Sequence, residues 1–89
     1  MTREDIENKV GGIIADIAGC DQDDVVPEAS LADDLYLDSL DAMDIQIELD
    51  IEFGTDFFSC EVEELGCKTV KDVYDIVEKE LINKLWKRK

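Results

Sequence analysis

The stretch Asp34-Leu35-Tyr36-Leu37-Asp38-Ser39-Leu40-Asp41 decides the fold, because a loop ends and a helix begins within it. The Asp38 carboxylate is suited to the N-cap position, where it can accept a hydrogen bond from an exposed N–H group, and Asp41 follows three residues later. The helical pattern then continues to Gly54, a residue type that commonly ends a helix. We therefore predict a helix over residues 39–53, with a serine in its first turn.

This predicted helix has one acidic face between two apolar ones. At 100° per residue, Asp44, Glu48 and Glu52 lie within about 60° of Asp41. The apolar residues flank this stripe, with Leu40, Met43, Ile47 and Ile51 on one side and Ala42, Ile45, Leu49 and Phe53 on the other. Two alternatives are open: the helix is buried on both sides, or one of its apolar faces is a binding surface.

The residues before this helix predict another helix and then a long loop. Thr2 and Asp5 have the spacing of a capping box, and Gly19 is placed to end a helix, so we expect residues 3–18 to be helical. Residues 20–37 show no long helical stripe, and such a long loop is expected to be packed. The apolar residues that should hold it to the body are Val25, Val26, Leu31, Leu35 and Leu37.

Two further helices are predicted in the last third of the chain. Ser59 can cap a short third helix over residues 60–65, and Thr69 with Asp72 repeats the capping-box spacing at the start of a fourth. The inward face of the fourth helix comprises Val70, Val73, Tyr74, Ile76, Val77 and Leu81. Because no segment has the pattern of a strand, the predicted fold class is all-α. We expect the whole chain to form a single domain, a four-helix bundle with a long first loop and a short third helix.

Negative charge dominates the middle of the chain. The formal net charge is -15, and sixteen acidic residues with no Lys or Arg lie between Asp21 and Glu64. Such a field repels nucleic acid phosphates and anionic lipid headgroups. We therefore expect protein partners with basic surfaces, and neither nucleic acid nor a membrane as a partner.

The sequence lacks the residues of most catalytic and metal sites. There is no histidine, no Gly-rich phosphate loop and no Ser or Cys beside a plausible base, so we expect no enzymatic activity. The three cysteines come without a histidine, and no segment fits the EF-hand calcium loop, so we expect no metal site. No apolar run approaches the roughly 20 residues that span a bilayer, and the N-terminus lacks the order of a signal peptide. The expected location is the cytoplasm.

Ser39 is the residue that suggests a function. At the first turn of a helix its hydroxyl can project into solvent, and a phosphate on it would lie near the positive end of the helix dipole, worth about 0.3–1 kcal/mol. Taken alone, the string Asp38-Ser39-Leu40-Asp41 is equally compatible with the alternative that Ser39 only occupies the first turn of a helix.

The string Asp38-Ser39-Leu40-Asp41 resembles the phosphopantetheine attachment motif of acyl carrier proteins, and the similarity extends from the first helix to the end of the fourth. The resemblance implies an acyl carrier with 4'-phosphopantetheine attached to Ser39 and Asp38 as its flanking acid. It implies acyl intermediates held as thioesters, for fatty acid synthesis or a specialised lipid or polyketide pathway. The implied partners of this monomer are a phosphopantetheinyl transferase and acyl-transferring and synthase enzymes with basic patches.

The resemblance also assigns roles to two sets of residues. The partner-binding positions it implies are Leu40, Asp41, Met43, Asp44, Ile47 and Glu48. The positions it implies for the acyl pocket are Ile45, Leu49, Phe53, Val62, Leu65, Val70, Val73 and Val77. The chain departs from the family at Tyr36 and Leu37, where a Gly and a small residue are common, and at residues 57–59, where many members have Ile-Pro-Asp.

Three other functions compete with an acyl carrier. A peptidyl or aminoacyl carrier uses the same arm but is often less acidic. A non-carrier acidic interaction module needs no modified serine, and a small calcium-binding protein would use the carboxylates themselves.

Overall fold

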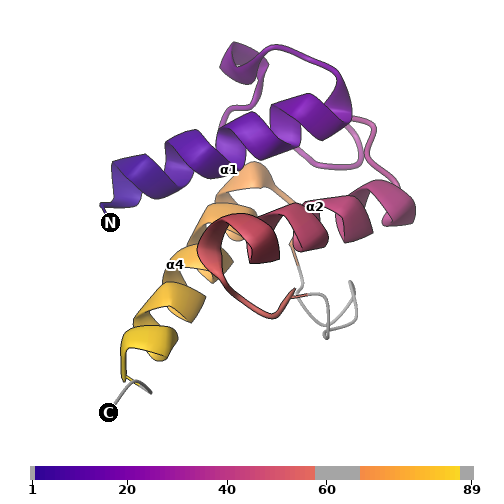
Figure 1. The fold of residues 1–89 in the computed structure, drawn as a ribbon. Coiled ribbons are helices and arrows are strands. Elements are labelled where there is room, and N and C mark those ends of the chain that lie inside the picture. The colour runs from indigo at the N-terminus through magenta and orange to yellow at the C-terminus, as the bar shows by residue number, and fades with distance from the viewer. Residues whose placement is uncertain (1, 58–66, 87–89) are drawn as a thin grey trace.

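The computed structural model describes residues 2–57 and 67–86, which form helices joined by irregular segments (Figure 1). Helix α1 spans Arg3–Ala18, the 3-10 helix η1 spans Gln22–Asp24, α2 spans Ser39–Phe53 and α4 spans Val70–Trp86. Within the described ranges the only β-pairing is an isolated bridge between Ser30 and Thr69. The protein is therefore helical, as predicted, whereas the predicted short helix over residues 60–65 lies outside the described residues.

Helices α1 and α2 begin at capping boxes and end at glycines, as predicted. At the start of α1 the Thr2 hydroxyl accepts a hydrogen bond from the Asp5 N–H group, and the Asp5 carboxylate accepts one from the Thr2 N–H group, both at 3.2 Å. Gly19 and Gly54 end the two helices with φ angles of 73° and 69°, a left-handed conformation that side chains disfavour. The predicted bounds of both helices are confirmed.

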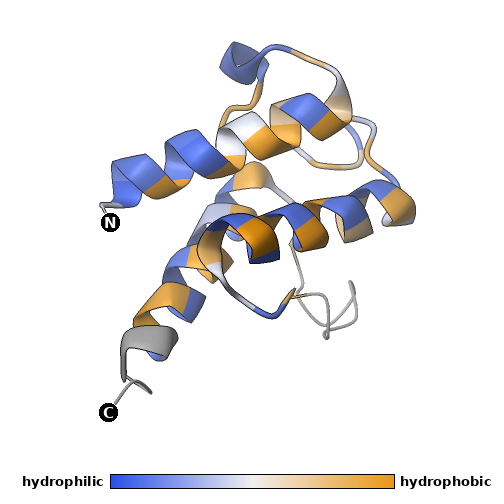
Figure 2. Ribbon diagram, viewed as in Figure 1, coloured by the Kyte–Doolittle hydropathy of each residue, from blue (hydrophilic) through white to orange (hydrophobic). Residues whose placement is uncertain are grey.

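The hydrophobic core lies where α1 packs against both α2 and α4. Figure 1 shows α1 and α2 running in opposite directions, with α4 starting behind them and descending away from α1. The apolar residues of α1 lie on the side that faces the other two helices (Figure 2). The most deeply buried side chains are Val10 and Ile14 of α1 and Val70 and Val77 of α4.

The loop between α1 and α2 differs from the prediction in two ways. It contains the short helix η1, which its sequence did not suggest. Val25 and Leu35 are buried as expected, but the Val26 side chain is 45% exposed, so its predicted packing is wrong. The reason is that successive side chains of non-helical backbone point in different directions, so Val25 takes the inward position and its neighbour faces solvent.

Three backbone hydrogen bonds tie this loop to the start of α4. The Leu31 N–H group donates to the Lys68 carbonyl at 2.9 Å. In return, the N–H groups of Val70 and Lys71 donate to the carbonyls of Ala29 and Pro27, at 3.1 and 3.0 Å. The first N–H groups of a helix have no acceptor within the helix, so the loop supplies two of the acceptors that α4 needs. This connection fixes the loop beside α4 just before the chain enters α2.

Candidate functional site

Ser39 is the first residue of α2, and its side chain is exposed. The turn before it is held by Asp38, whose carboxylate accepts a hydrogen bond from the Asp41 N–H group at 2.9 Å. The Asp41 carboxylate accepts one from the Asp38 N–H group at 3.2 Å. Because these two aspartates form the cap, the start of α2 does not depend on the Ser39 hydroxyl.

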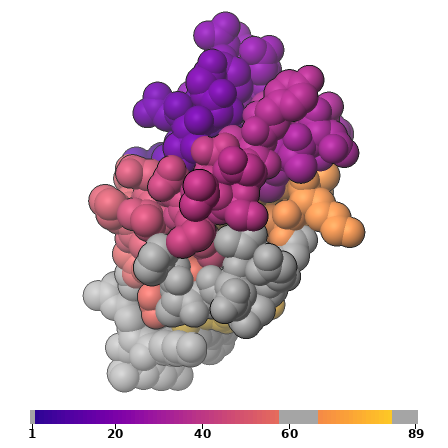
Figure 3. All heavy atoms as spheres, turned by 90° about the vertical axis from the view of Figure 1, so that its right-hand side faces the viewer, coloured from indigo at the N-terminus to yellow at the C-terminus, as the bar shows by residue number. Residues whose placement is uncertain are grey.

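Ser39 lies at the edge of an open cleft of about 510 Å³. The cleft is bounded by the long loop, the first two turns of α2 and residues 67 and 68, which precede α4. Figure 3 looks onto this end of the molecule, where the loop and the start of α2 lie beside the segment that opens α4. A group attached to Ser39 could therefore extend either into solvent or along the cleft.

A smaller apolar cavity of about 60 Å³ lies next to this cleft, beneath α2. Leu31, Ala42, Ile45 and Cys67 line both spaces, so the two are adjacent. The cavity also has Leu49, Val73 and Ile76 in its wall, together with Gln46 and Phe57. The path from Ser39 thus leads through the cleft toward the hydrophobic core.

The residues that the resemblance assigned to an acyl pocket fall into three groups. Ile45, Leu49 and Val73 line the small cavity. Phe53, Val70 and Val77 are buried in the core but are not among the residues that line it. Val62 and Leu65 lie outside the described residues.

Six residues of the cavity wall were not among the predicted pocket residues: Leu31, Ala42, Gln46, Phe57, Cys67 and Ile76. Ala42 and Ile76 were expected to face inward and Leu31 to pack against the body, whereas Gln46 and Phe57 were given no role. Gln46 is polar and lies among the apolar residues of α2, and that position was its one signal. Phe57 follows the end of α2 in a segment noted only as a departure from the family. The cavity brings the two together.

One apolar face of α2 is exposed, so the alternative in which the helix is buried on both sides is wrong. Leu40 and Ile51 are 70% and 73% exposed, and Met43 and Ile47 are also exposed, whereas Ile45, Leu49 and Phe53 on the other face are buried. Asp44 and Glu48 lie exposed beside the apolar stripe. Asp41, also expected on this surface, is half-buried and belongs to the cap of α2.

Burial changes the acidity of the thiol beside the cleft. The pKa of Cys67 is raised to about 11, chiefly because the thiol is shielded from water and secondarily because Asp72 and Asp75 are negatively charged. At neutral pH the Cys67 thiol is therefore protonated and a weak nucleophile.

The described part of the chain has neither a cluster of metal-binding side chains nor a helix suited to a bilayer. Residues 2–57 and 67–86 contain no group of three or more Cys, Asp or Glu side chains placed to hold a metal ion. Among the helices of those ranges, none has the length and apolar character needed to cross a membrane.

Comparison with known proteins places the chain in a family. A family model described as the phosphopantetheine attachment site matches residues 8–77. The acyl carrier protein of Thermosynechococcus vestitus is 44% identical over 86% of this chain and 93% of its own length. Those of Thermotoga maritima and Coprothermobacter proteolyticus are 39% and 36% identical, over 90% and 94% of this chain and 96% and 100% of their own lengths. The chain therefore belongs to the acyl carrier protein family and has its phosphopantetheine attachment domain.

Proposed function

We propose that Ser39 is the residue through which this acyl carrier holds its 4'-phosphopantetheine arm. The observation that carries the proposal is the position of Ser39, exposed at the first residue of α2 and at the edge of a cleft that adjoins an apolar cavity. When bound, the arm supplies a thiol on which acyl groups are carried as thioesters.

The surroundings of Ser39 fit a phosphodiester. The positive end of the α2 dipole favours an anion at this place by about 0.3–1 kcal/mol. The Asp38 and Asp41 cap holds the helix start without the serine hydroxyl, so modification of the oxygen breaks none of the cap hydrogen bonds. The chain supplies position and exposure, and the transferase performs the chemistry.

The cleft and cavity are suited to shelter an acyl group. Ile45 lines both spaces, and Leu49 and Val73 lie deeper, in the wall of the cavity. Burying apolar surface there stabilises by about 25 cal/mol per Å². Cys67 also lines both spaces, and its protonated thiol would be slow to attack a thioester held nearby. Burial of the Cys67 thiol therefore helps to protect the carried thioester from attack.

The exposed face of α2 is the proposed docking surface for the transferase and for acyl-transferring and synthase enzymes. It joins the apolar side chains of Leu40, Met43 and Ile47 to the carboxylates of Asp44 and Glu48. Apolar contacts give such an encounter its affinity, and the carboxylates attract basic patches and speed association. A carrier that visits several enzymes in turn requires contacts of this exchangeable kind.

The finer features of the family are proposed for this chain as well. They are a short helix over residues 60–65 that completes a four-helix bundle, and a single non-enzymatic domain that works as a monomer in the cytoplasm. The net charge of -15 supports basic proteins as the partners, because it repels nucleic acid and anionic lipid.

Incubation with coenzyme A and a phosphopantetheinyl transferase, followed by intact mass measurement, tests the site. Wild type should gain the mass of one phosphopantetheine, and Ser39→Ala should gain none. Ser30→Ala is the matched control, because Ser30 lines the same cleft, and this variant should load normally. Loading of Ser39→Ala would show that the attachment site lies elsewhere.

A further inference from the structure

Phe57 is fastened to α2 through both of its backbone polar groups. Its N–H group donates to the Asp50 carboxylate at 2.7 Å, and its carbonyl accepts a hydrogen bond from the Gln46 side-chain amide at 3.0 Å. The same carboxylate oxygen of Asp50 accepts from the Thr55 hydroxyl at 2.7 Å. The segment that follows α2 is therefore folded back onto the helix and held by two of its side chains.

Gln46 is a buried polar side chain in an apolar wall. It is 4% exposed and lies in the wall of the small cavity, where its described neighbours are apolar side chains and Cys67. Burial of an amide is unfavourable unless the group is hydrogen-bonded, and a leucine would suit an apolar wall better. The Gln46 amide donates to the Phe57 carbonyl, and this hydrogen bond helps to hold the aromatic residue in place.

The Phe57 side chain occupies the wall of the same cavity. It is 3% exposed and packs in the core. The remaining space is about 60 Å³, much smaller than the cleft of about 510 Å³ beside it. Phe57 and Gln46 line this cavity but not the Ser39 cleft, so they belong to the wall away from the cleft. An acyl group that enters from the cleft and is too long for the cavity has to displace part of that wall.

We propose that Gln46 and Phe57 form a stop that limits the length of acyl chain sheltered in the core. This inference rests on the proposed attachment at Ser39. Displacement of Phe57 separates its carbonyl from Gln46 and its N–H group from Asp50, so entry of a longer chain costs hydrogen bonds as well as packing. The carrier shelters short acyl groups and leaves the ends of longer ones in the cleft, where partner enzymes and water can reach them.

A series of acyl forms tests the stop. The full chain is loaded by the transferase with acetyl-, butyryl-, hexanoyl-, octanoyl- and decanoyl-coenzyme A, and Tm is measured for each form against the form with a bare arm. In wild type, Tm should rise over the shortest chains and then level off, because further carbons find no buried space. A Tm that climbs steadily to decanoyl would overturn the proposal.

Variants of the stop make the test specific. Phe57→Leu enlarges the cavity, and Gln46→Met removes the hydrogen bond at similar side-chain volume. In both variants the levelling point should move to longer chains than in wild type. Phe53→Leu is the control, because it makes the same change at a buried phenylalanine that is not among the cavity-lining residues. It should lower Tm throughout and leave the levelling point in place.

The outcomes separate the two proposals. Wild-type mass that shows no loading at all would refute attachment at Ser39. Normal loading with the same levelling point in wild type, Phe57→Leu and Gln46→Met would refute the stop and leave the carrier function standing. An equal shift of the levelling point in Phe53→Leu would also refute the stop, because a general loosening of the core would then determine how long a chain is sheltered.

Discussion

The guanidinium group of Arg3 lies 2.8 Å from the carboxylate of Asp75, which joins the first turn of α1 to α4. Two more carboxylates surround it, Glu7 at 2.9 Å and Glu78 at 3.1 Å, and the centre of the Tyr74 ring lies 5.8 Å from the guanidinium carbon. Hydrogen bonds to Glu7 and then Asp75 raise the pKa of Arg3 further above its already high value. The chain has a net charge of -15, so carboxylates on α1 and α4 repel one another. Arg3 offsets this repulsion in addition to forming ion pairs with them.

Replacement of Arg3 by methionine should therefore lower the free energy of unfolding by about 1 kcal/mol at low salt, at the upper end of the range for surface ion pairs. Lys9→Met is the control, because Lys9 pairs with the exposed Glu52 at 3.1 Å and should cost less. Urea unfolding at two salt concentrations measures both variants. Equal losses for the two would contradict a special role for the Arg3 cluster.

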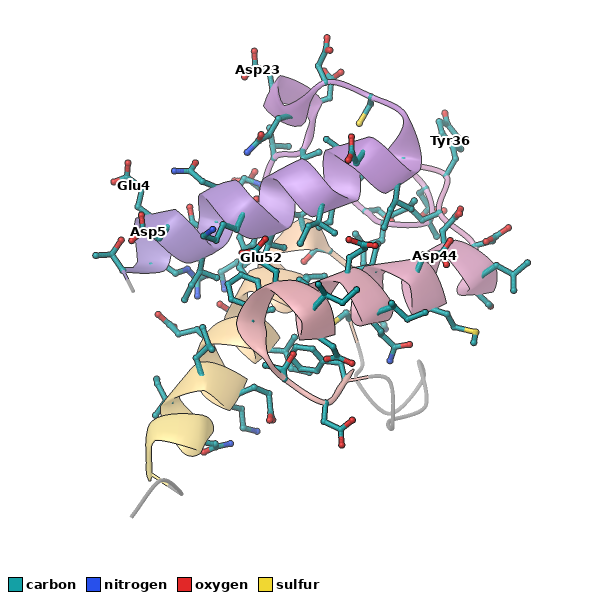
Figure 4. The ribbon with its side chains drawn as sticks, in the orientation of Figure 1. Glu4, Asp5, Asp23, Tyr36, Asp44 and Glu52 are labelled. Carbon is teal, nitrogen blue, oxygen red and sulfur yellow. The ribbon has the colours of Figure 1, made fainter. Side chains whose placement is uncertain are left out.

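Charge reversal on α2 should slow loading of Ser39. Asp44→Lys with Glu48→Lys changes two exposed carboxylates of the proposed docking surface and should reduce the association rate with the transferase several-fold at low salt. Asp41 is left intact, since its carboxylate caps α2. Figure 4 shows Asp44 on α2 and Asp23 on η1, with α1 between them in this view. Asp23→Lys with Asp24→Lys therefore provides the same change of charge away from the docking surface. Identical loading rates for the two double variants at low salt would rule out docking through α2.

Tyr36 should tolerate glycine better than valine. Its φ of 58° lies in the left-handed region, which costs a residue with a side chain about 1–2 kcal/mol, and its side chain is 83% exposed and projects from the body of the molecule (Figure 4). Tyr36→Gly relieves this cost and gives up little packing, although the unfolded chain gains freedom worth about 0.5–1 kcal/mol. We expect equal or higher stability for glycine and a loss of about 1 kcal/mol or more for valine. Chemical denaturation that ranks valine above glycine would contradict this reading of the backbone.

Asp72 should make the fold sensitive to acid. Its pKa is lowered because the carboxylate accepts hydrogen bonds from the Lys68 and Thr69 N–H groups, at 2.9 and 3.1 Å. A carboxyl whose pKa is lower in the folded state stabilises the fold above its unfolded value of about 3.9, and this contribution is lost as the pH falls through the folded value. Asp72→Asn should thus be less stable than wild type at neutral pH, by about 1 kcal/mol or less. Unfolding measured across the acid range should show the gap closing, and a gap that stays constant in acid would disprove the assignment.

The sequence predicted those features that depend on neighbours along the chain. The bounds of α1 and α2 follow from Thr2, Asp38 and the two terminal glycines, because a cap acts within one turn. Periodicity alone left the exposure of the Leu40 face open, because it depends on what the rest of the chain covers, and only the resemblance to the family implied it.

The missed features are those that join distant segments or lack a local pattern. The pairing of Gln46 with Phe57 depends on how the chain folds back after α2, which no periodicity encodes. The partial burial of Asp41, by contrast with the exposure of Asp44 and Glu48 on the same stripe, likewise depends on the folded chain.

The connection between the long loop and α4 determines how fast individual amide hydrogens exchange with solvent. Amides in the first turn of a helix ordinarily exchange fast, because they lack acceptors. Those of Val70 and Lys71 donate instead to carbonyls of the loop, so deuterium can replace them only when the loop lifts away from α4. The exchange rates of these two amides therefore measure how often the border of the Ser39 cleft opens, without any probe attached to the cleft itself.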